Sequence, residues 1–240
     1  PTLDHRPKRR FDRGMKAILL SLFVALLMVG CGESDLSDPD VVEDATADAV
    51  DWSKLQDRDG VTYLPNTQEP FSGYAKRAYE NEQVEALAEF KKGKQDGLSV
   101  EWYENGQKKS EGNFKEGKPD GLWTYWYENG QKKEEVNCKD GKREGLSTTW
   151  KKNGQKEWEI NWKDAMPHGL LTQWYPNGQK VREITIKDGD KFMSAEVWKP
   201  NGEKCPVTNV KDGNGVMVWY KEDGTELFRF TYKDGEQVRD

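Results

Sequence analysis

Few residues in this chain could do chemistry, and their spacing does not assemble a catalytic site. Apart from His5, the only histidine is His168, in the turn Met166-Pro167-His168-Gly169. Its surroundings offer no Ser-His-Asp or Cys-His set, the arrangements that activate a nucleophile. A recurring glutamate column (Glu111, Glu135, Glu159, Glu183) would place copies about 9.6 Å apart on an open sheet, without the burial that raises a carboxyl pKa. The sequence therefore predicts a protein that is not an enzyme and uses no cofactor.

Two cysteines, Cys138 and Cys205, invite a disulfide, but they fall at different phases of the pattern and lie nearly three repeat units apart. Cα atoms so far apart cannot be bridged. We expect both thiols to be unpaired, with Cys138 as a small apolar filler. A bond between molecules through Cys205 is the alternative. Nothing in their spacing resembles that of metal ligands, so no metal site is expected.

A third cysteine, Cys31, ends the stretch MKAILLSLFVALLMVGCGES, which begins at Met15. The uncharged apolar run from Ala17 to Val29 is 13 residues long. It is too short for a membrane-spanning helix and has the length of a secretory signal core. We therefore expect residues 1–30 to be a signal peptide, in which residues 1–14 are either upstream readthrough or an extended basic region.

This stretch resembles a bacterial lipoprotein signal peptide, with Met28-Val29-Gly30-Cys31 as its lipobox. The resemblance implies cleavage before Cys31 and lipid attachment to that residue. Several acyl chains would anchor the protein to a membrane. Because Gly32 follows the cysteine, the resemblance implies an exported protein at the outer membrane, on its periplasmic or surface face. An ordinary signal peptide with an incidental cysteine is the alternative, and the choice between inner and outer membrane stays open.

The segment after Cys31 is acidic, with eight Asp or Glu residues and no basic or aromatic residue between positions 32 and 51. Such composition predicts a solvated chain, so we expect residues 31–57 to be a flexible tether. A calcium site would need regular ligand spacing and a loop glycine, which this segment lacks. Without residues 1–30 the chain holds 31 basic and 41 acidic residues, a net charge of −10. That charge argues against nucleic acid as a partner.

Residues 58–240 form a repeat array. The octapeptide WYENGQKK begins at Trp102 and again at Trp126, and its relatives follow at Trp150, Trp174 and Trp198, always 24 residues on. In each unit an alternating apolar segment precedes an Asn-Gly turn, a second strand follows, and a wider turn containing Glu-Gly or Asp-Gly ends the unit. The sequence therefore predicts an all-β fold, an elongated antiparallel meander of repeated 24-residue hairpins.

The parity of the Asn-Gly loop decides which side chains share a face. We predict a three-residue Glu-Asn-Gly loop with a left-handed glycine, which puts the apolar residues of both strands on one aromatic face. Tyr103, Tyr127 and the glutamate column would then lie on a second, solvated face. Candidate binding residues on the aromatic face are Trp102, Trp126, Trp150, Trp174, Trp198, Trp158, Trp162 and Phe114.

These repeats resemble the MORN-like repeats, a variant of the membrane occupation and recognition nexus repeat, whose bacterial members include a YwqK-type antitoxin family. The resemblance rests on PFSG at Pro70–Gly73, on the YENGQKK turns, and on the Gly-Leu that starts each unit, as at Gly97. It covers roughly residues 58–240 and implies a β-hairpin array. The aromatic hairpins, such as Gly121–Gly130, are also similar to the cell-wall and choline-binding repeats of surface proteins.

A single-layer sheet cannot bury an apolar face by itself, so something must cover it or bind to it. The aromatic residues either pack as the core of the repeats or anchor a protein partner, and glycan stacking is a further alternative. The sequence thus predicts a lipid-anchored, non-catalytic module for protein binding or scaffolding. The alternatives are an antitoxin or immunity protein that binds a toxin and a module that binds cell-wall glycan.

Overall fold

The computed structural model describes residues 39–238. The chain divides into two units, residues 1–43 and 44–240, and helix α2 begins in the first and ends in the second. The predicted signal peptide and Cys31 lie outside the described residues, so their roles stay predictions. None of the helices within residues 39–238 is both long and apolar enough to cross a membrane.

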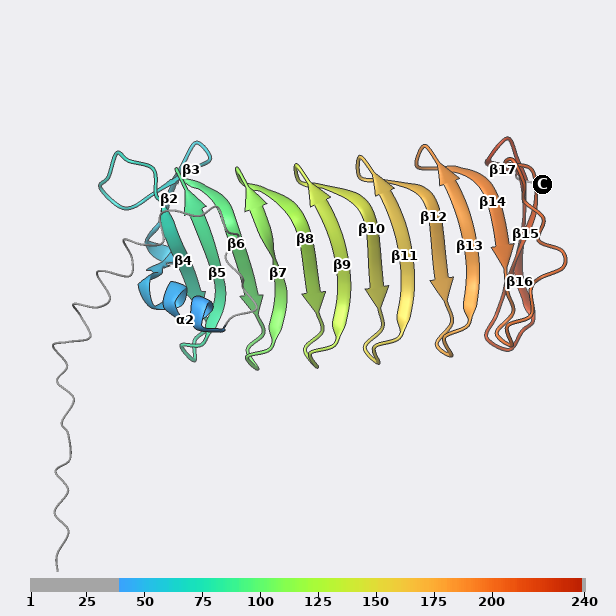
Figure 1. Ribbon diagram of the computed structural model, residues 1–240, viewed down its shortest axis with the longest axis horizontal. Helices are drawn as coiled ribbons and strands as arrows, with labels where there is room; N and C mark the ends of the chain where they lie inside the picture. The colour runs from blue at the N-terminus through green and yellow to red at the C-terminus, as the bar shows by residue number, and fades with distance from the viewer. Residues whose placement is uncertain (1–38, 239–240) are drawn as a thin grey trace, which may run out of the picture. The chain divides into compact units, whose positions relative to one another are not determined.

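The second unit is built on one long sheet, as the 24-residue period predicts. Its 12 strands run in the order β1-β4 and then consecutively from β5 to β14, which Figure 1 shows as a row from green to orange. All neighbours from β4 onward are antiparallel, while β1 is parallel to β4. The predicted hairpin array is confirmed. Its elements are α2 Pro39–Asp48, β1 Val50–Asp51, β4 Gly73–Ala78, β5 Val84–Lys91, β6 Lys94–Trp102, β7 Lys108–Lys115, β8 Lys118–Trp126, β9 Lys132–Lys139, β10 Lys142–Trp150, β11 Lys156–Lys163, β12 Met166–Trp174, β13 Lys180–Lys187 and β14 Lys191–Val197.

The Asn-Gly turns have the predicted three-residue loop. In the hairpin from β6 to β7, the Tyr103 amide donates to the Gln107 carbonyl at 2.8 Å, and Gly106 adopts a φ of +81°. The Asn105 side chain accepts a hydrogen bond from the Gln107 amide at 3.0 Å, which holds the turn closed. Only glycine adopts this left-handed conformation without a steric cost, which explains why Gly106 is repeated.

The predicted single aromatic face is nevertheless wrong. Beyond the loop Trp102 pairs with Lys108, but the next pair is Glu101 with Ser110, so Lys109 is an extra residue that forms a β-bulge. One extra residue reverses the alternation of side chains, and it cancels the parity change that the three-residue loop introduces. Strand residues such as Val100 therefore share a face with Glu111 instead of with Phe114.

The turn predicted to be the wider one is in fact the tighter. Lys115 pairs directly with Lys118, and the two residues between them, Glu116 and Gly117, have φ angles of +49° and +82°. Positive φ at both central residues defines the two-residue turn that matches the twist of antiparallel strands. The remaining residues of the expected turn belong to β8, whose pairing with β7 is irregular there, and Gly121 has a φ of +83°.

The two faces of the sheet differ in how strictly they repeat. We call the first the constant face, because its columns hardly change from unit to unit. We call the second the variable face, because its columns change in every unit. The constant face carries Leu98, Leu122, Leu146, Leu170, Trp102, Trp126, Trp150, Trp174, Trp198, Lys108, Lys132, Lys156, Lys180, Glu111, Glu135, Glu159 and Glu183. The variable face carries Ser99, Trp123, Ser147, Leu171, Glu101, Tyr125, Thr149, Gln173, Ser110, Glu134, Trp158, Arg182, Gly112, Val136, Ile160, Ile184, Phe114, Cys138, Trp162 and Ile186.

The tyrosines of the repeated octapeptide tie each hairpin to the next, so their predicted place on a solvated face is wrong. The hydroxyl of Tyr103 donates to the Trp126 carbonyl at 2.8 Å, and that of Tyr127 donates to the Trp150 carbonyl at 2.9 Å. The turn asparagines make similar bonds, as from Asn105 to the Glu128 carbonyl at 2.9 Å. These bonds use the same residue types in successive units, which is why the octapeptide recurs.

Replacing Tyr127 with phenylalanine is expected to lower the free energy of unfolding by about 1 kcal/mol. The substitution removes the donor to the Trp150 carbonyl and keeps the ring. Urea unfolding followed by circular dichroism measures the change. Tyr74→Phe is the control, because the Tyr74 hydroxyl has no hydrogen-bond partner among residues 39–238. Equal losses of unfolding free energy in the two variants would contradict the conclusion that the Tyr127 hydroxyl stabilises the contact between neighbouring hairpins.

The C-terminal end of the variable face is covered by a second, three-stranded sheet formed by β15 (Gly215–Tyr220), β16 (Glu226–Lys233) and β17 (Glu236–Val238). Met217 and Val218 of β15 are fully buried against the variable-face residue Ile184. Burial of this apolar surface closes the array at this end. The cluster also contains Ile186, Ala195, Val197, Cys205, Val210 and Tyr232.

The N-terminal end of the variable face is covered by the segment that precedes the array. Helix η1 (Trp52–Lys54) is a 3-10 helix, and β2 (Gln56–Arg58) pairs with β3 (Val61–Tyr63). Trp52 packs edge-on against Phe90, with ring centroids 5.4 Å apart. A flexible tether as far as residue 57 was therefore the wrong expectation for this segment, because apolar side chains within it are held in a core cluster.

Candidate binding face

Three of the constant-face tryptophans are not free binding rings, because a lysine of the preceding unit lies over each of them. The ammonium of Lys132 lies 5.9 Å from the centroid of the Trp150 ring, and Lys156 and Lys180 take the same place over Trp174 and Trp198 at 5.6 and 5.5 Å. A cation over an aromatic face is attracted by the ring quadrupole. These tryptophans thus belong to the packing between units.

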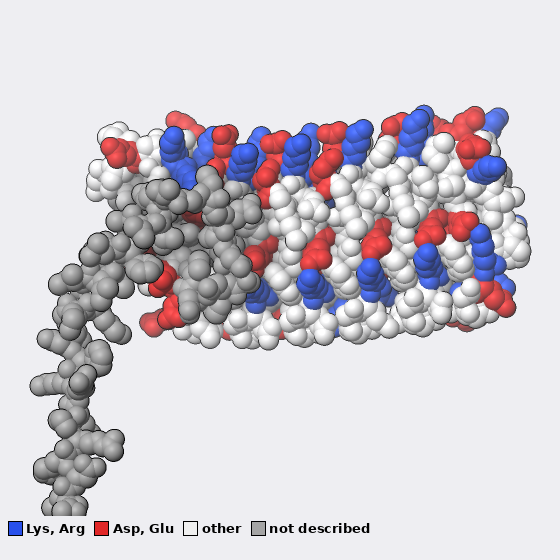
Figure 2. Space-filling view, in the orientation of Figure 1, with Lys and Arg blue, Asp and Glu red and all other residues white. Residues whose placement is uncertain are grey.

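The same lysines pair with glutamates three residues along their own strands. Lys132 with Glu135 and Lys156 with Glu159 are two of four such pairs. Figure 2 shows a face on which acidic and basic side chains form parallel rows along the array. Exposed ion pairs contribute at most about 1 kcal/mol each. The rows therefore give the constant face a regular, neutralised surface, and its leucines, such as Leu122 at 51% exposure, stand singly between them.

The variable face differs from unit to unit because its residues fit their neighbours in pairs. Trp123 lies over Gly112, where a Cβ atom would come within 2.3 Å of the indole. The equivalent cross-strand pair in the next unit is Ser147 with Val136. In these two pairs a larger residue faces a small one, which fills the volume across the strand boundary, whereas Leu171 faces Ile160 in the unit after. Trp123 also makes an edge-on contact with Phe114, with centroids 5.2 Å apart.

Arginine, glutamate and tryptophan meet at the centre of the variable face. Arg143 forms an ion pair with Glu134 at 2.8 Å, and its guanidinium carbon lies 5.1 Å from the centroid of the Trp162 ring. The Arg143 side chain is 42% exposed, whereas the Glu134 side chain is 17% exposed. Arginine and tryptophan are the residue types that contribute most at protein interfaces. This cluster is half-buried and lies between the two covered ends.

Arg182 follows the central cluster toward the C-terminal sheet. Its guanidinium carbon lies 5.2 Å from the centroid of the Trp158 ring and 4.1 Å from that of Trp219. Burial lowers the pKa of Arg182, because a charge is disfavoured away from water. No carboxylate within residues 39–238 forms an ion pair with it.

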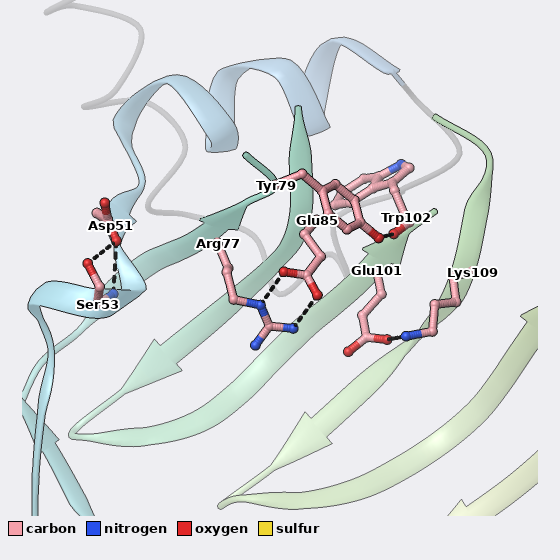
Figure 3. A network of polar contacts seen from close by, with 8 residues as sticks. All are labelled: Asp51, Ser53, Arg77, Tyr79, Glu85, Glu101, Trp102 and Lys109. Carbon is pink, nitrogen blue, oxygen red and sulfur yellow. Dashed lines mark hydrogen bonds and ion pairs between the residues drawn. The ribbon is translucent and has the colours of Figure 1, made fainter. Parts of the chain in front are cut away.

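Charged residues at the N-terminal end of the variable face already have partners. Figure 3 shows Arg77 held by both oxygens of Glu85, and the bulge residue Lys109 paired with Glu101 at 3.0 Å. The Arg77 guanidinium lowers the pKa of the Glu85 carboxyl by hydrogen bonding. Because these charges satisfy one another and this end is covered, the central part of the face is the better candidate for contact with a partner.

The cysteines are unpaired, as predicted. Burial raises the pKa of the Cys138 thiol. Cys205 is 3% exposed, and its sulfur lies 2.9 Å from the Tyr220 hydroxyl, so its burial argues against the alternative of a bond between molecules. The pKa of Tyr220 is raised to about 12 by burial and by this hydrogen bond. Within residues 39–238, no group of three His, Cys, Asp or Glu side chains could hold a metal ion.

The structure thus splits the predicted binding residues between the two faces. The five tryptophans of the octapeptide column lie on the constant face, and Trp158, Trp162 and Phe114 lie on the variable face. The prediction missed Trp123, Arg143 and Arg182. A signal for them was present in the sequence, because positions that vary among otherwise identical units are free to be specialised. The signal was not recognised because the β-bulge reverses which side chains share a face.

Three segments of the chain match the model of the MORN repeat variant, residues 95–116, 119–140 and 167–188. No curated protein matches the chain. Residues 143–164 fall between two matched segments and form the same hairpin from β10 and β11, although Lys151 replaces the tyrosine there. MORN repeats are generally non-catalytic binding repeats. The three matched segments are thus similar to MORN variant repeats, and each lies within the consecutive hairpins of one antiparallel sheet.

Proposed function

We propose that this protein is a non-catalytic binding module that recognises a protein partner through the variable face. One observation carries the proposal. The columns that repeat strictly lie on the constant face and in the turns, while the columns that differ between units lie together on the variable face. Repeat proteins typically keep the residues that stack the units and specialise the surface that binds. The stretch between the covered ends is where a partner would lie.

The side chains of this stretch favour a protein partner over a glycan. Sugars stack on open aromatic ring faces, but guanidinium groups lie over Trp158 and Trp162. Aromatic residues and arginine, with few other charges, are the composition of the centre of a protein interface. The half-buried rings would act as anchors, and the Arg143–Glu134 pair would set the orientation of the partner.

We further propose that the module is anchored at the bacterial envelope through lipid on Cys31. The support is the lipobox Met28-Val29-Gly30-Cys31 after an apolar run of signal-peptide length. In this setting the partner would be another envelope protein. An immunity role, in which the partner is a toxin, is the runner-up within the same binding function.

The binding proposal is tested by capture from detergent-solubilised envelope with the full chain carrying Trp158→Ser and Trp162→Ile. Both substitutions copy residues that other units have at the same positions, Ser110 and Ile186, so the hairpins should still form. Because buried tryptophans are typical anchors worth about 2 kcal/mol or more, recovery of the partner should fall roughly 30-fold or more. Quantitative mass spectrometry measures the recovery.

The matched control is Leu122→Ser plus Leu146→Ser on the constant face, where both leucines are about half exposed. These changes should leave capture unchanged. Loss of capture in the control with retention in the tryptophan variant would place the interface on the constant face and refute the proposal. Retention of the protein on purified peptidoglycan that depends on Trp158 would identify a glycan instead. A Cys31→Ala chain that still takes up a fatty-acid label would refute the anchor.

A further inference from the structure

Two stacked side chains at the C-terminal end of the variable face each carry a buried hydrogen-bond donor without an acceptor. Three buried side-chain polar atoms within residues 39–238 lack a hydrogen-bond partner, and two of them are Arg182 Nε and Trp219 Nε1. Leaving a buried donor unpaired costs about 1 to 3 kcal/mol, and more for a charged group. Both atoms are donors only, so neither can satisfy the other. The pair therefore calls for an acceptor from outside the described chain.

A cavity lies beside these two donors. Arg182 and Trp219 are among its lining residues, together with Trp174 and Tyr175, and its volume is about 310 Å³. That volume can hold a small group with an apolar body, because several of the walls are aromatic. The guanidinium carbon of Arg182 lies 4.1 Å from the centroid of the Trp219 ring, so the two side chains stand stacked together at the wall of the cavity.

The charged residues that line the cavity favour the binding of an anion. Three cationic residues line it, Arg182, Lys151 and Lys221, against one carboxylate, that of Glu222. The cavity is thus positive on a chain whose net charge is −6. On the same face Arg143 has Glu134 as its partner, whereas Arg182 has no carboxylate within ion-pairing distance in the described part of the chain. An external anion would supply the missing partner.

We propose that this cavity binds a carboxylate of a peptide, with Arg182 as its main cationic partner. A carboxylate on an apolar residue fits the cavity better than inorganic phosphate, because its planar oxygens match the guanidinium fork and aromatic side chains line much of the wall. The aromatic walls suit an apolar residue next to the carboxylate, as at the C-terminus of a chain. That the carboxylate comes from a peptide rests on the proposed function.

Equilibrium dialysis of the full chain against radiolabelled N-acetyl-L-leucine tests the site. The expected result is saturable binding that unlabelled N-acetyl-L-leucine displaces, but that its amide and inorganic phosphate displace at least tenfold less well. Arg182→Gln should weaken binding at least tenfold, since a charge-assisted hydrogen bond is about twice as strong as a neutral one. Trp219→Phe should weaken it less, because the ring stays and only the N–H is lost.

Arg77→Gln is the matched control, because this arginine lies at the other end of the same face and is already held by both oxygens of Glu85. It should bind the probe as the unmodified chain does. Equal displacement by the amide or by phosphate would overturn the proposal, as would full binding in Trp219→Phe and Arg182→Gln chains. If dialysis finds no saturable binding while capture still depends on Trp158 and Trp162, this inference fails and the proposed function stands. Saturable binding of the probe without any captured partner would support the carboxylate site and contradict the proposed function.

Discussion

Replacing Gly112 with valine is expected to lower the free energy of unfolding by about 3 kcal/mol, near the upper end of the usual cost of overpacking. The indole of Trp123 lies directly on Gly112, and an added Cβ would approach its ring atoms to 2.3 Å. The ring cannot withdraw easily, because it stacks on Tyr125 and contacts Phe114 edge-on. The substitution should therefore displace Trp123 from a site where it is 6% exposed.

The chain offers its own compensating variant. The pair Val136 with Ser147 occupies the same two positions one unit later, so Gly112→Val combined with Trp123→Ser reproduces a combination that already packs. A double-mutant cycle by urea unfolding should give a favourable coupling energy of about 1 to 3 kcal/mol. A coupling near zero would contradict the idea that variable-face residues are matched in pairs across the strand boundary.

Replacing Met217 with alanine is expected to cost about 2 to 5 kcal/mol of unfolding free energy. Met217 is fully buried where β15 packs over the variable face, and truncation leaves a cavity between the two sheets. The second sheet should therefore unfold locally at a lower free-energy cost than the long sheet. Hydrogen exchange would then show faster exchange in β15 and β16 than in β10 and β11.

The control for this prediction is Leu227→Ala, because Leu227 lies on the neighbouring strand β16 and is 42% exposed. Its loss should change the unfolding midpoint little, since few atoms leave a packed environment. Uniform acceleration of exchange over all strands in the Met217 variant would show instead that the two sheets unfold as one cooperative unit.

The repeat itself could be predicted from the sequence because its causes are local. The alternation around Leu98 and Val100, the Asn105-Gly106 turn and the 24-residue period each depend on residues close together in the chain. The three-residue loop was also predictable, since a left-handed glycine follows the asparagine. Strand order followed from short connections, which leave each hairpin next to its neighbour.

The assignment of side chains to faces could not be predicted, because one bulge residue in each second strand reverses it. That residue is Lys109, Lys133, Glu157 or Val181 in successive units, so no residue type marks the bulge. The glutamate and tryptophan columns consequently share a face, although alternation alone separates them. A bulge is stabilised by the neighbouring strand, which the local sequence does not contain.

The sequence by itself determined that this protein is an array of antiparallel hairpins, because turn chemistry and alternation act within a single unit. Only the tertiary structure decided which residues could meet a partner. Residues 50–72 and 205–238 cover the two ends of the variable face, and they bring Trp219 against Arg182 from 37 positions away. Such contacts depend on packing between distant segments, and no periodic pattern in the chain encodes them.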